Sequence, residues 1–212
     1  TDKAVNPSNI MGASKRIAES YCQALDLERG PNRTRFITVR FGNVLGSAGS
    51  VVSLFRDQIS NGGPVTVTDP KMKRYFMTVR EAVALVLAAS ALGTTQPKQL
   101  GKIFVLEMGK PVLIQSLAEQ MIRLAGHSPG EDIKIVYTGL RPGEKLFEEM
   151  FHDGEKLVET SQSGVMLAAP RVVDLEDIIL QVDRINKTIS TNNEKSLTKI
   201  IHALVPEYNP PS

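Results

Sequence analysis

Cysteine, tryptophan and long apolar runs are scarce or absent in this sequence. The single cysteine, Cys22, excludes an internal disulfide framework, and its place in a helical pattern indicates a core or boundary residue. His127, His152 and His202 lie far apart without a second ligand at metal-binding spacing, so no metal site is expected. No apolar stretch approaches the roughly 20 residues that cross a bilayer, and no signal-peptide pattern opens the sequence. We therefore expect the chain as given to be soluble and cytoplasmic.

An excess of charge of one sign is also absent. The 212 residues include 25 basic and 23 acidic ones, and the formal net charge of +2 comes without a sustained basic stripe. A nucleic-acid partner is therefore not expected. The 42% hydrophobic content is enough for a sizeable core at this length. Small or acidic ligands could still bind at local basic sites.

Alternating helical and strand-like segments indicate an α/β protein. Apolar residues at three- and four-residue steps predict a helix from residue 10 to about 28, capped by Asn9 and ended by Gly30 and Pro31. Further helices are predicted at 49–63, 78–92, 113–126, 174–189 and 192–204, and strands at 34–46, 64–69, 101–109 and 133–140. The second half is the more mixed part, and its order is least defined beyond Glu155.

The opening stretch, TDKAVNPSNIMGASK, is dense in reactive groups. Thr1, Asp2 and Lys3 bring a hydroxyl, an acid and an amine together, and Met11 and Lys15 share one face of the predicted helix because they are four residues apart. Taken alone, such a Met and Lys would be a core residue and a solvated one. The stretch is either a charged, frayed terminus or part of an active site.

This stretch resembles the active-site segment of the nucleotide-sugar branch of the extended short-chain dehydrogenase/reductases, specifically the UDP-N-acetylglucosamine 4,6-dehydratases of capsule, O-antigen and flagellin-glycan synthesis. In that family a Thr-Asp-Lys triplet precedes a Tyr-x-x-x-Lys pair at the spacing found here between Thr1, Met11 and Lys15. The resemblance continues through RFGNVLGSAGSVV, VTVTDPKMKRYFMT, RPGEKLFEE and LVPEY, and so covers nearly the whole chain.

The resemblance also implies a fold: the C-terminal part of a Rossmann-like parallel sheet, with a smaller mixed α/β substrate-binding region. Residues 1–60 would hold the last Rossmann elements and the catalytic segment. Residues 61–212 would form the UDP-sugar binding region with its closing helices.

The reaction that this family carries out needs an acid and a base side by side. Bound NAD⁺ takes hydride from carbon 4 of the sugar, a base removes the proton on carbon 5, an acid protonates the departing 6-hydroxyl, and the hydride returns to carbon 6. By resemblance, Lys3 is the base and Asp2 the acid. Near neutral pH these roles need a lowered pKa for Lys3 and a raised pKa for Asp2, which a salt bridge between them would oppose. Adjacent strand residues point to opposite faces, so the pair can meet one sugar only where the backbone has left the strand.

Met11 departs from the family's usual pattern, which has Tyr at this position. A long, membrane-anchored subgroup of the family has Met there, and this sequence resembles that subgroup. A thioether cannot carry a proton, so deprotonation of the sugar 4-hydroxyl falls to Thr1, Asp2 or an ordered water. Lys15 is implied to hold the nicotinamide ribose hydroxyls.

Two later segments are implied to contact the substrate through amide groups. Asn43, at the end of a predicted strand, is implied to contact the diphosphate or uridine. The alternative is that Asn43 only forms a turn before the next helix. Ser50 and Val51 begin a predicted helix whose backbone N–H groups could bind an anion. Capping without a ligand is the alternative for this helix start.

Two arginines are assigned to the pyrophosphate. Arg74, in KRYFMT, and Arg141, in RPGEKL, suit this role because a guanidinium can make paired contacts with phosphate oxygens. Surface exposure is the ordinary alternative for a lone arginine. Glu144 could accept hydrogen bonds from the nucleotide ribose or pair with Arg141.

A glycine-rich dinucleotide motif is missing, because no G-x-G-x-x-G follows a strand in these residues. We therefore expect weak or no activity from this chain alone, as the C-terminal part of a larger enzyme that binds NAD tightly. That enzyme is expected to form a homo-oligomer and to lie on the cytoplasmic face of the inner membrane through segments that this sequence does not contain.

Two other functions remain open. A related nucleotide-sugar epimerase or reductase would usually keep the Tyr and lack the acid–base pair. A noncatalytic UDP-sugar binding or assembly module would keep Arg74 and Arg141 but be indifferent to Asp2 and Lys3.

Overall fold

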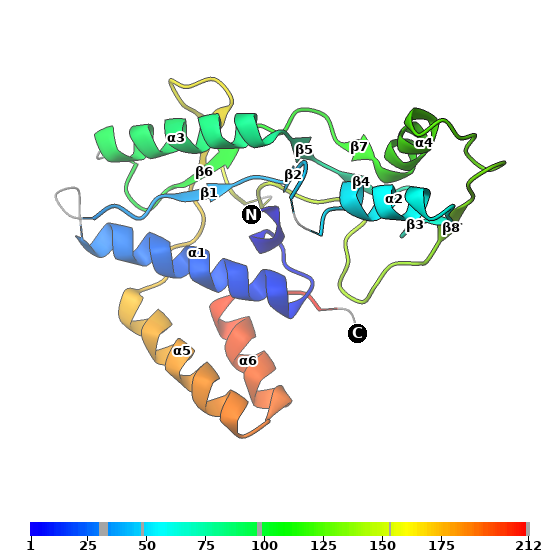
Figure 1. The fold of residues 1–212 in the computed structure, drawn as a ribbon. Helices are drawn as coiled ribbons and strands as arrows, with labels where there is room; N and C mark the ends of the chain where they lie inside the picture. The colour runs from blue at the N-terminus through cyan, green and yellow to red at the C-terminus, as the bar shows by residue number, and fades with distance from the viewer. Residues whose placement is uncertain (30–33, 48, 97–98, 153, 211–212) are drawn as a thin grey trace. The chain divides into compact units, whose positions relative to one another are not determined.

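The protein is described by a computed structural model that covers residues 1–29, 34–47, 49–96, 99–152 and 154–210 (Figure 1). The chain divides into two compact units. Unit 1 consists of Thr1–Phe41, Ala84–Glu107 and Glu149–Ser212, and unit 2 consists of Gly42–Val83 and Met108–Glu148. Each unit has its own strands and its own hydrophobic cluster, and each is described by itself.

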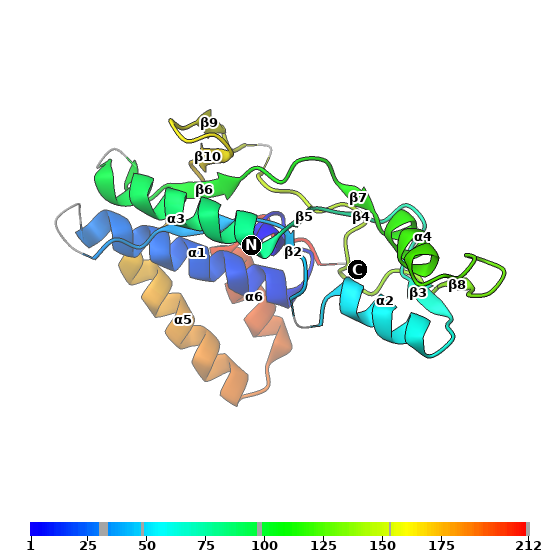
Figure 2. The same ribbon diagram turned by 45° about the horizontal axis from the view of Figure 1, so that its top comes forward.

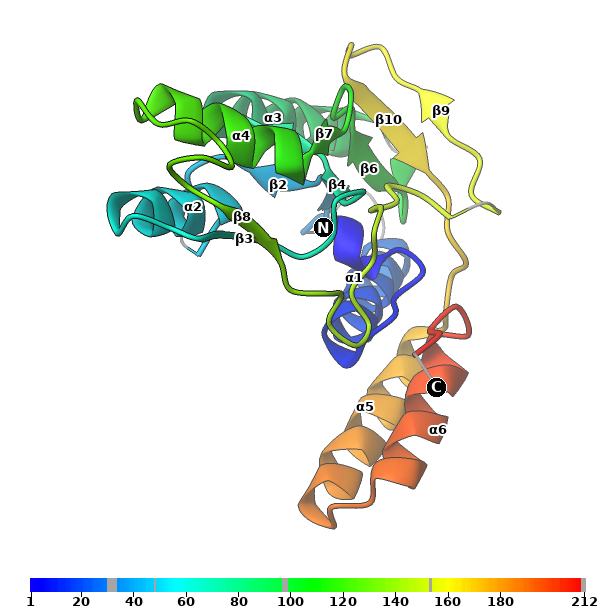
Figure 3. The same ribbon diagram turned by 90° about the vertical axis from the view of Figure 1, so that its right-hand side faces the viewer.

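Unit 1 contains a four-stranded sheet in the order β1-β6-β10-β9. The strands are β1 (Thr38–Arg40), β6 (Ile103–Leu106), β10 (Val165–Ala168) and β9 (Val158–Glu159). β1 and β6 are parallel. β10 runs antiparallel to both of its neighbours, β6 and β9 (Figure 3). All four residues of β6 are buried, as expected for a strand covered on both faces. Helix α1 (Ile10–Arg29) and the later part of α3 (Val79–Thr95) lie on opposite sides of β1 and β6 (Figures 1 and 2).

A helical hairpin packs against α1 within unit 1. It is formed by α5 (Leu175–Ser190) and α6 (Glu194–Leu204). Asp174 caps α5, because its carboxylate accepts the backbone N–H groups of Glu176 and Asp177. The apolar faces of the three helices and the residues after α6 bury one cluster: Ala13, Ala24, Ile178, Ile201, Leu204, Val205 and Tyr208.

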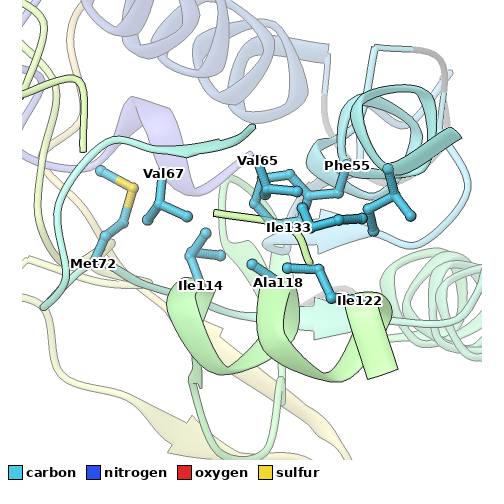
Figure 4. Packing of buried hydrophobic residues seen from close by; sticks show 9 residues of the cluster. Phe55, Val65, Val67, Met72, Ile114, Ala118, Ile122 and Ile133 are labelled. Atoms are coloured by element: carbon cyan, nitrogen blue, oxygen red, sulfur yellow. The ribbon is translucent and has the colours of Figure 1, made fainter. Parts of the chain in front are cut away.

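Unit 2 is built around the parallel strands β3 (Val65–Val67) and β8 (Ile135–Tyr137), with α2 (Val51–Ser60) and α4 (Ile114–Leu124) packed beside them. The side chains of Ile114, Ala118 and Ile122, four residues apart, lie along one face of α4 and point toward the strands (Figure 4). Two further pairs complete this unit: β2 (Asn43–Val44) with β5 (Phe76–Met77), and β4 (Lys73–Arg74) with β7 (Val112–Leu113).

The predicted α/β class and all six predicted helices are confirmed. The Asn9 cap is confirmed too, since its Oδ1 accepts the N–H of Gly12 at 2.9 Å, whereas the predicted stop at Gly30 and Pro31 lies outside the described residues. One strand prediction was wrong: 34–46 is not continuous, because the chain leaves β1 at Phe41 and then pairs with β5 as β2. β4, β5, β7, β9 and β10 were not predicted. The functional division at residue 60 stays a prediction, since the two units are defined by packing.

Cys22 is half-buried on α1, and burial, aided by the negative charge of Glu19, raises the pKa of its thiol. This is the boundary environment that the sequence indicated.

In the part of the chain that the structure describes, every helix is too short or too polar to cross a membrane.

Candidate active site

The predicted catalytic triplet lies in a short 3-10 helix, η1 (Asp2–Ala4), in unit 1. The hydroxyl of Thr1 caps this turn by accepting the N–H of Lys3 at 3.5 Å, and the carbonyl of Asp2 accepts the N–H of Val5 at 3.1 Å. The N–H of Asp2 also donates to the carbonyl of Phe41 at 3.2 Å, which attaches the turn to the end of β1. The expectation that the backbone leaves a regular strand at this pair is confirmed.

The side chains of Asp2 and Lys3 form an ion pair. Lys3 Nζ lies 3.1 Å from Asp2 Oδ1, and the hydroxyl of Thr1 donates to the same oxygen at 3.2 Å. The Asp2 side chain is 1% exposed and that of Lys3 is 37% exposed, so the amine is the accessible member. Asp2 Oδ2 is buried and has no hydrogen-bond partner among the described residues. Of the two carboxyl oxygens of Asp2, it is therefore the one whose hydrogen-bonding capacity is unused among the described residues.

Met11 and Lys15 lie on the solvent side of α1, as their spacing predicts. Met11 is 52% exposed, so it is not the core residue that its type alone would suggest. Lys15 is exposed, and its ammonium has no hydrogen bond or ion pair with any residue that the structure describes. A free ammonium on this face has the donor chemistry that two ribose hydroxyls require.

The loop between η1 and α1 has an unusual backbone at Asn6. Its φ of 40° lies in the left-handed region, which non-glycine residues seldom occupy and Asn tolerates best. The Asn6 side chain donates to Glu149 Oε1 at 3.2 Å. The left-handed residue and its contact define the path of the loop from Lys3 to α1.

A buried charge network beneath α1 was not found from the sequence. Arg40, 1% exposed at the end of β1, makes paired hydrogen bonds with Glu19 of α1, with Nε 3.0 Å from Oε1 and Nη2 2.9 Å from Oε2. Arg40 Nη1 also donates to Glu155 Oε2 at 2.7 Å. The position of Arg40 between apolar residues of a predicted strand was an available signal, since a buried charge needs partners.

Arg74, predicted to bind pyrophosphate, is held by its own unit. In unit 2 its guanidinium donates to the backbone carbonyls of Lys145 at 2.8 Å and Leu146 at 3.1 Å. Its Nε also lies 3.6 Å from Glu148 Oε1. Arg74 therefore fastens the 145–148 segment to β4, and phosphate contact by it stays a prediction.

Arg141 and Glu144 meet through the backbone rather than through an ion pair. The N–H of Arg141 donates to Glu144 Oε2 at 3.2 Å, and the N–H of Glu144 donates to the carbonyl of Arg141 at 2.9 Å. Glu144 Oε1 lies 3.9 Å from Arg74 Nη2, so these three predicted residues are neighbours. The Arg141 guanidinium is exposed and unpaired within the described part of the chain, which leaves it available to an anion.

The remaining predicted substrate residues also lie in unit 2. Asn43 begins β2, is half-buried, and donates its backbone N–H to Tyr75. Ser50 caps α2 by accepting the N–H of Ser53 at 3.3 Å, and Val51 is the first residue of that helix. The structure thus collects the predicted catalytic residues in unit 1 and the predicted substrate residues in unit 2.

The sequence is similar to that of a capsular polysaccharide biosynthesis protein and to that of a nucleotide-sugar epimerase. The chain is 58% identical to the capsular polysaccharide biosynthesis protein CapD of Staphylococcus aureus over 155 residues, which are 73% of this chain and 24% of that protein. It is 38% identical over 150 residues to a UDP-glucose 4-epimerase of Rickettsia canadensis (strain McKiel), covering 71% of this chain and 41% of the relative. The chain thus spans about a quarter of the capsular relative and less than half of the epimerase.

A solved structure is also similar. The X-ray structure of Pen from Bacillus thuringiensis matches with a TM-score of 0.69 and 34% identity, over 82% of this chain and 51% of that one. The family model for the polysaccharide biosynthesis protein family matches residues 1–170, which include every predicted site residue. On this match the chain belongs to the polysaccharide biosynthesis protein family.

Proposed function

We propose that this chain supplies the acid–base pair and part of the substrate site of an NAD-dependent 4,6-dehydratase. Its substrate would be UDP-N-acetylglucosamine or a close analogue, and its 4-keto-6-deoxy product would serve surface polysaccharide synthesis. The observation that carries the proposal is the contact of Lys3 Nζ with Asp2 Oδ1 at 3.1 Å, in a turn that a short loop connects to the helix with Met11 and Lys15. An amine and a carboxyl group in contact suit an elimination, which removes one proton and delivers another.

The two residues would divide the elimination between them. Lys3, the accessible member, would take the proton from carbon 5 in its neutral amine form. Asp2, in its acid form, would give a proton to the departing 6-hydroxyl, so that the carbon–oxygen bond breaks and water leaves. Lys3 would therefore release its ammonium proton to solvent before the reaction, and Asp2 would gain its proton from the sugar 4-hydroxyl when carbon 4 is oxidised. Once the 6-hydroxyl has left as water and hydride has returned to carbon 6, Lys3 would return a proton to carbon 5.

Thr1 is our candidate for the group that takes the proton of the sugar 4-hydroxyl, because the thioether of Met11 cannot accept a proton. Its hydroxyl already donates to Asp2 Oδ1 at 3.2 Å. A sugar 4-hydroxyl beside Thr1 could pass its proton through this hydroxyl toward the carboxylate. The thioether of Met11 would contribute only apolar contact.

The described residues fit one part of NAD. Lys15, exposed and unpaired within the described chain, would donate to the nicotinamide ribose hydroxyls. NAD supplies the group that accepts hydride from carbon 4 and returns it to carbon 6. The sequence has no glycine-rich turn for the pyrophosphate, so the rest of the dinucleotide would need other residues.

The nucleotide end of the substrate would bind in unit 2. Arg141 is exposed and has no ion pair among the described residues, and Arg74 holds the segment that follows it. The side-chain amide of Asn43, the hydroxyl of Ser50 and the N–H of Val51 would add neutral donors to the diphosphate. The N–H of Ser50 is not available, because it donates to the carbonyl of Ser47. We further propose that 1–60 and 61–212 serve as catalytic and substrate regions of a homo-oligomeric enzyme at the inner membrane.

A nucleotide-sugar epimerase is the second candidate, because the chain is 38% identical to a UDP-glucose 4-epimerase. Epimerisation at carbon 4 needs hydride transfer and one proton acceptor but no acid for a leaving hydroxyl. The Asp2–Lys3 contact therefore favours the dehydratase over the epimerase, and a noncatalytic binding module would not need the contact at all.

The test is to incubate the full-length protein with UDP-N-acetylglucosamine and NAD⁺ and to identify the product by mass and NMR. Wild type should form a 4-keto-6-deoxy sugar, and Lys3→Ala should lose turnover while retaining affinity for UDP. Turnover unaffected by Lys3→Ala would remove the acid–base assignment. A 4-epimer as the product would favour the second candidate.

A further inference from the structure

The C-terminal segment, residues 204–209, lies against the predicted catalytic segment within unit 1. Asn209 donates its backbone N–H to the carbonyl of Pro7 at 2.9 Å, and Pro7 belongs to the loop between η1 and α1. Glu207 accepts a hydrogen bond from Arg16 Nε at 2.8 Å, and Arg16 directly follows Lys15. Tyr208 is 5% exposed in the cluster between the hairpin and α1. One short segment thus contacts both the loop and the helix of the candidate site.

The contact between Glu207 and Arg16 is part of the buried network already described. The side chain of Arg16 is 4% exposed and that of Glu207 is 15% exposed. Arg16 Nη1 lies 3.8 Å from Glu19 Oε2, and Glu19 is bound by Arg40. Positive and negative charges therefore alternate from the C-terminal segment through α1 to the sheet and the 150s loop: Glu207, Arg16, Glu19, Arg40 and Glu155.

The orientation of α1 follows from this arrangement. Arg16 and Glu19 occupy the buried side of the helix, while Met11 and Lys15 occupy the exposed side. Any rotation of α1 about its axis that moved Lys15 would pull Arg16 from Glu207 and Glu19 from Arg40. Buried ion pairs tolerate such separation poorly, because each charge would be left without a partner.

We propose that the C-terminal segment positions the catalytic segment, with Glu207 as a positioning residue that acts through Arg16 on Lys15, and the Asn209 N–H as the group that fixes the loop after Lys3. The segment lies outside residues 1–170, the range of the family model. The catalytic meaning of this positioning rests on the proposed function. The contacts themselves can be tested separately.

The backbone contact has a matched pair of variants. Asn209→Pro removes the N–H donor to Pro7, whereas Asn209→Ala loses the same side chain and keeps the donor. Hydrogen–deuterium exchange of the full-length protein should show the amides of Ala4 and Val5, which close η1, exchanging about fivefold faster in Asn209→Pro, the effect of one lost hydrogen bond. Asn209→Ala should match wild type. Equal exchange in both variants would overturn the loop-fixing role.

The side-chain contact is tested by kinetics per NAD-loaded active site. Glu207→Gln should lower kcat about tenfold with KM for the UDP-sugar unchanged within about twofold, because a misplaced catalytic group slows chemistry more than binding. Glu207→Asp, which retains the charge, should recover part of the rate. Glu28→Gln, the same change at an exposed position on α1, should leave kcat unchanged.

A lower melting temperature in Glu207→Gln with an unchanged kcat per loaded site would overturn the positioning role, since a merely structural residue changes only the amount of folded enzyme. If the wild type makes no 4-keto-6-deoxy product, the proposed function fails instead. The exchange experiment then still decides whether the C-terminal segment fixes η1.

Discussion

Gly12 of α1 lies directly against the carbonyl of Lys3. A Cβ added at Gly12 would be 2.5 Å from that backbone oxygen and 2.9 Å from the Cβ of Pro7. Only glycine permits this approach between the helix and the turn that carries the candidate base. The absence of a side chain at Gly12 therefore sets the distance between Lys3 and the face that presents Met11 and Lys15.

Gly12→Ala should impair the site even though alanine is the better helix former by about 1 kcal/mol. The added methyl group must displace the backbone of Lys3, and a shift of about 1 Å can cost up to about 100-fold in rate. We expect at least about tenfold lower turnover and a lower melting temperature. Ser14→Ala, at an exposed position on the same helix, should behave like wild type. A more stable and fully active Gly12→Ala protein would contradict the close packing.

Substitutions of Arg141 and Arg74, both in unit 2, should separate an effect on UDP binding from an effect on stability. Arg141→Gln should weaken UDP binding about tenfold or more, because a charge-assisted hydrogen bond contributes roughly 1.5–3 kcal/mol, and should leave the melting temperature unchanged. Arg74→Gln should lower both, since the carbonyls of Lys145 and Leu146 lose their donors. Calorimetric titration with UDP and thermal melting measure the two effects. Unchanged UDP affinity in Arg141→Gln would show that this residue is an ordinary surface arginine.

Arg40→Met should destabilise the chain strongly. The substitution leaves the buried carboxylates of Glu19 and Glu155 without their main partner, and removing one member of a buried ion pair costs about 3–5 kcal/mol. Urea unfolding at neutral pH measures the loss. Arg80→Met, at an exposed position on α3, should stay within about 0.5 kcal/mol of wild type. A similarly small effect at Arg40 would mean that the network is dispensable for folding.

Ionised Asp26 should contribute to the free energy of unfolding, and this contribution should be lost at acid pH. Burial by itself raises the pKa of this carboxyl, but hydrogen bonds from the Arg35 side chain and from the N–H groups of Gly101 and Phe36 outweigh burial and lower it. A lowered folded-state pKa contributes stability that is present above the unfolded value of about 3.9 and is lost as pH falls through the folded value.

Asp26→Asn should therefore be less stable than wild type at pH 7, and the gap should narrow below about pH 4. The measurement is the free energy of unfolding in urea for both proteins across this range. The same substitution at an exposed acid, Asp183→Asn, serves as the control. A gap that stays constant with pH would contradict the assigned role of the Asp26 charge.

The helices, and the departure of the Thr1–Lys3 triplet from a regular strand, could be predicted from sequence because their signals are local. Asn9 caps α1 through a hydrogen bond to Gly12, three residues away, and the triplet Thr1–Lys3 closes its own turn. The division of the strand at Gly42 was not predictable from the apolar run. There the backbone N–H bonds to the sulfur of Met108, 66 residues away.

The partners of buried charges were likewise beyond local reasoning. Arg40 is conspicuous in an apolar strand, but its partner Glu155 is 115 residues away in the sequence. Arg16 and its partner Glu207 are separated by 191 residues. Apolar periodicity identified the buried face of α1 only in part, because Ile10 and Tyr21 of the apolar pattern are exposed whereas Arg16 and Glu19 are buried. Met11, exposed on the face opposite these charges, shows that residue type alone can also mislead.

The most direct test of the dehydratase assignment is to run the full-length enzyme with UDP-N-acetylglucosamine in D₂O. Lys3 should remove the carbon 5 proton and exchange it with solvent, so the 4-keto-6-deoxy product should carry one deuterium at carbon 5. Product with protium retained at carbon 5, or a 4-epimer without deuterium, would contradict the account.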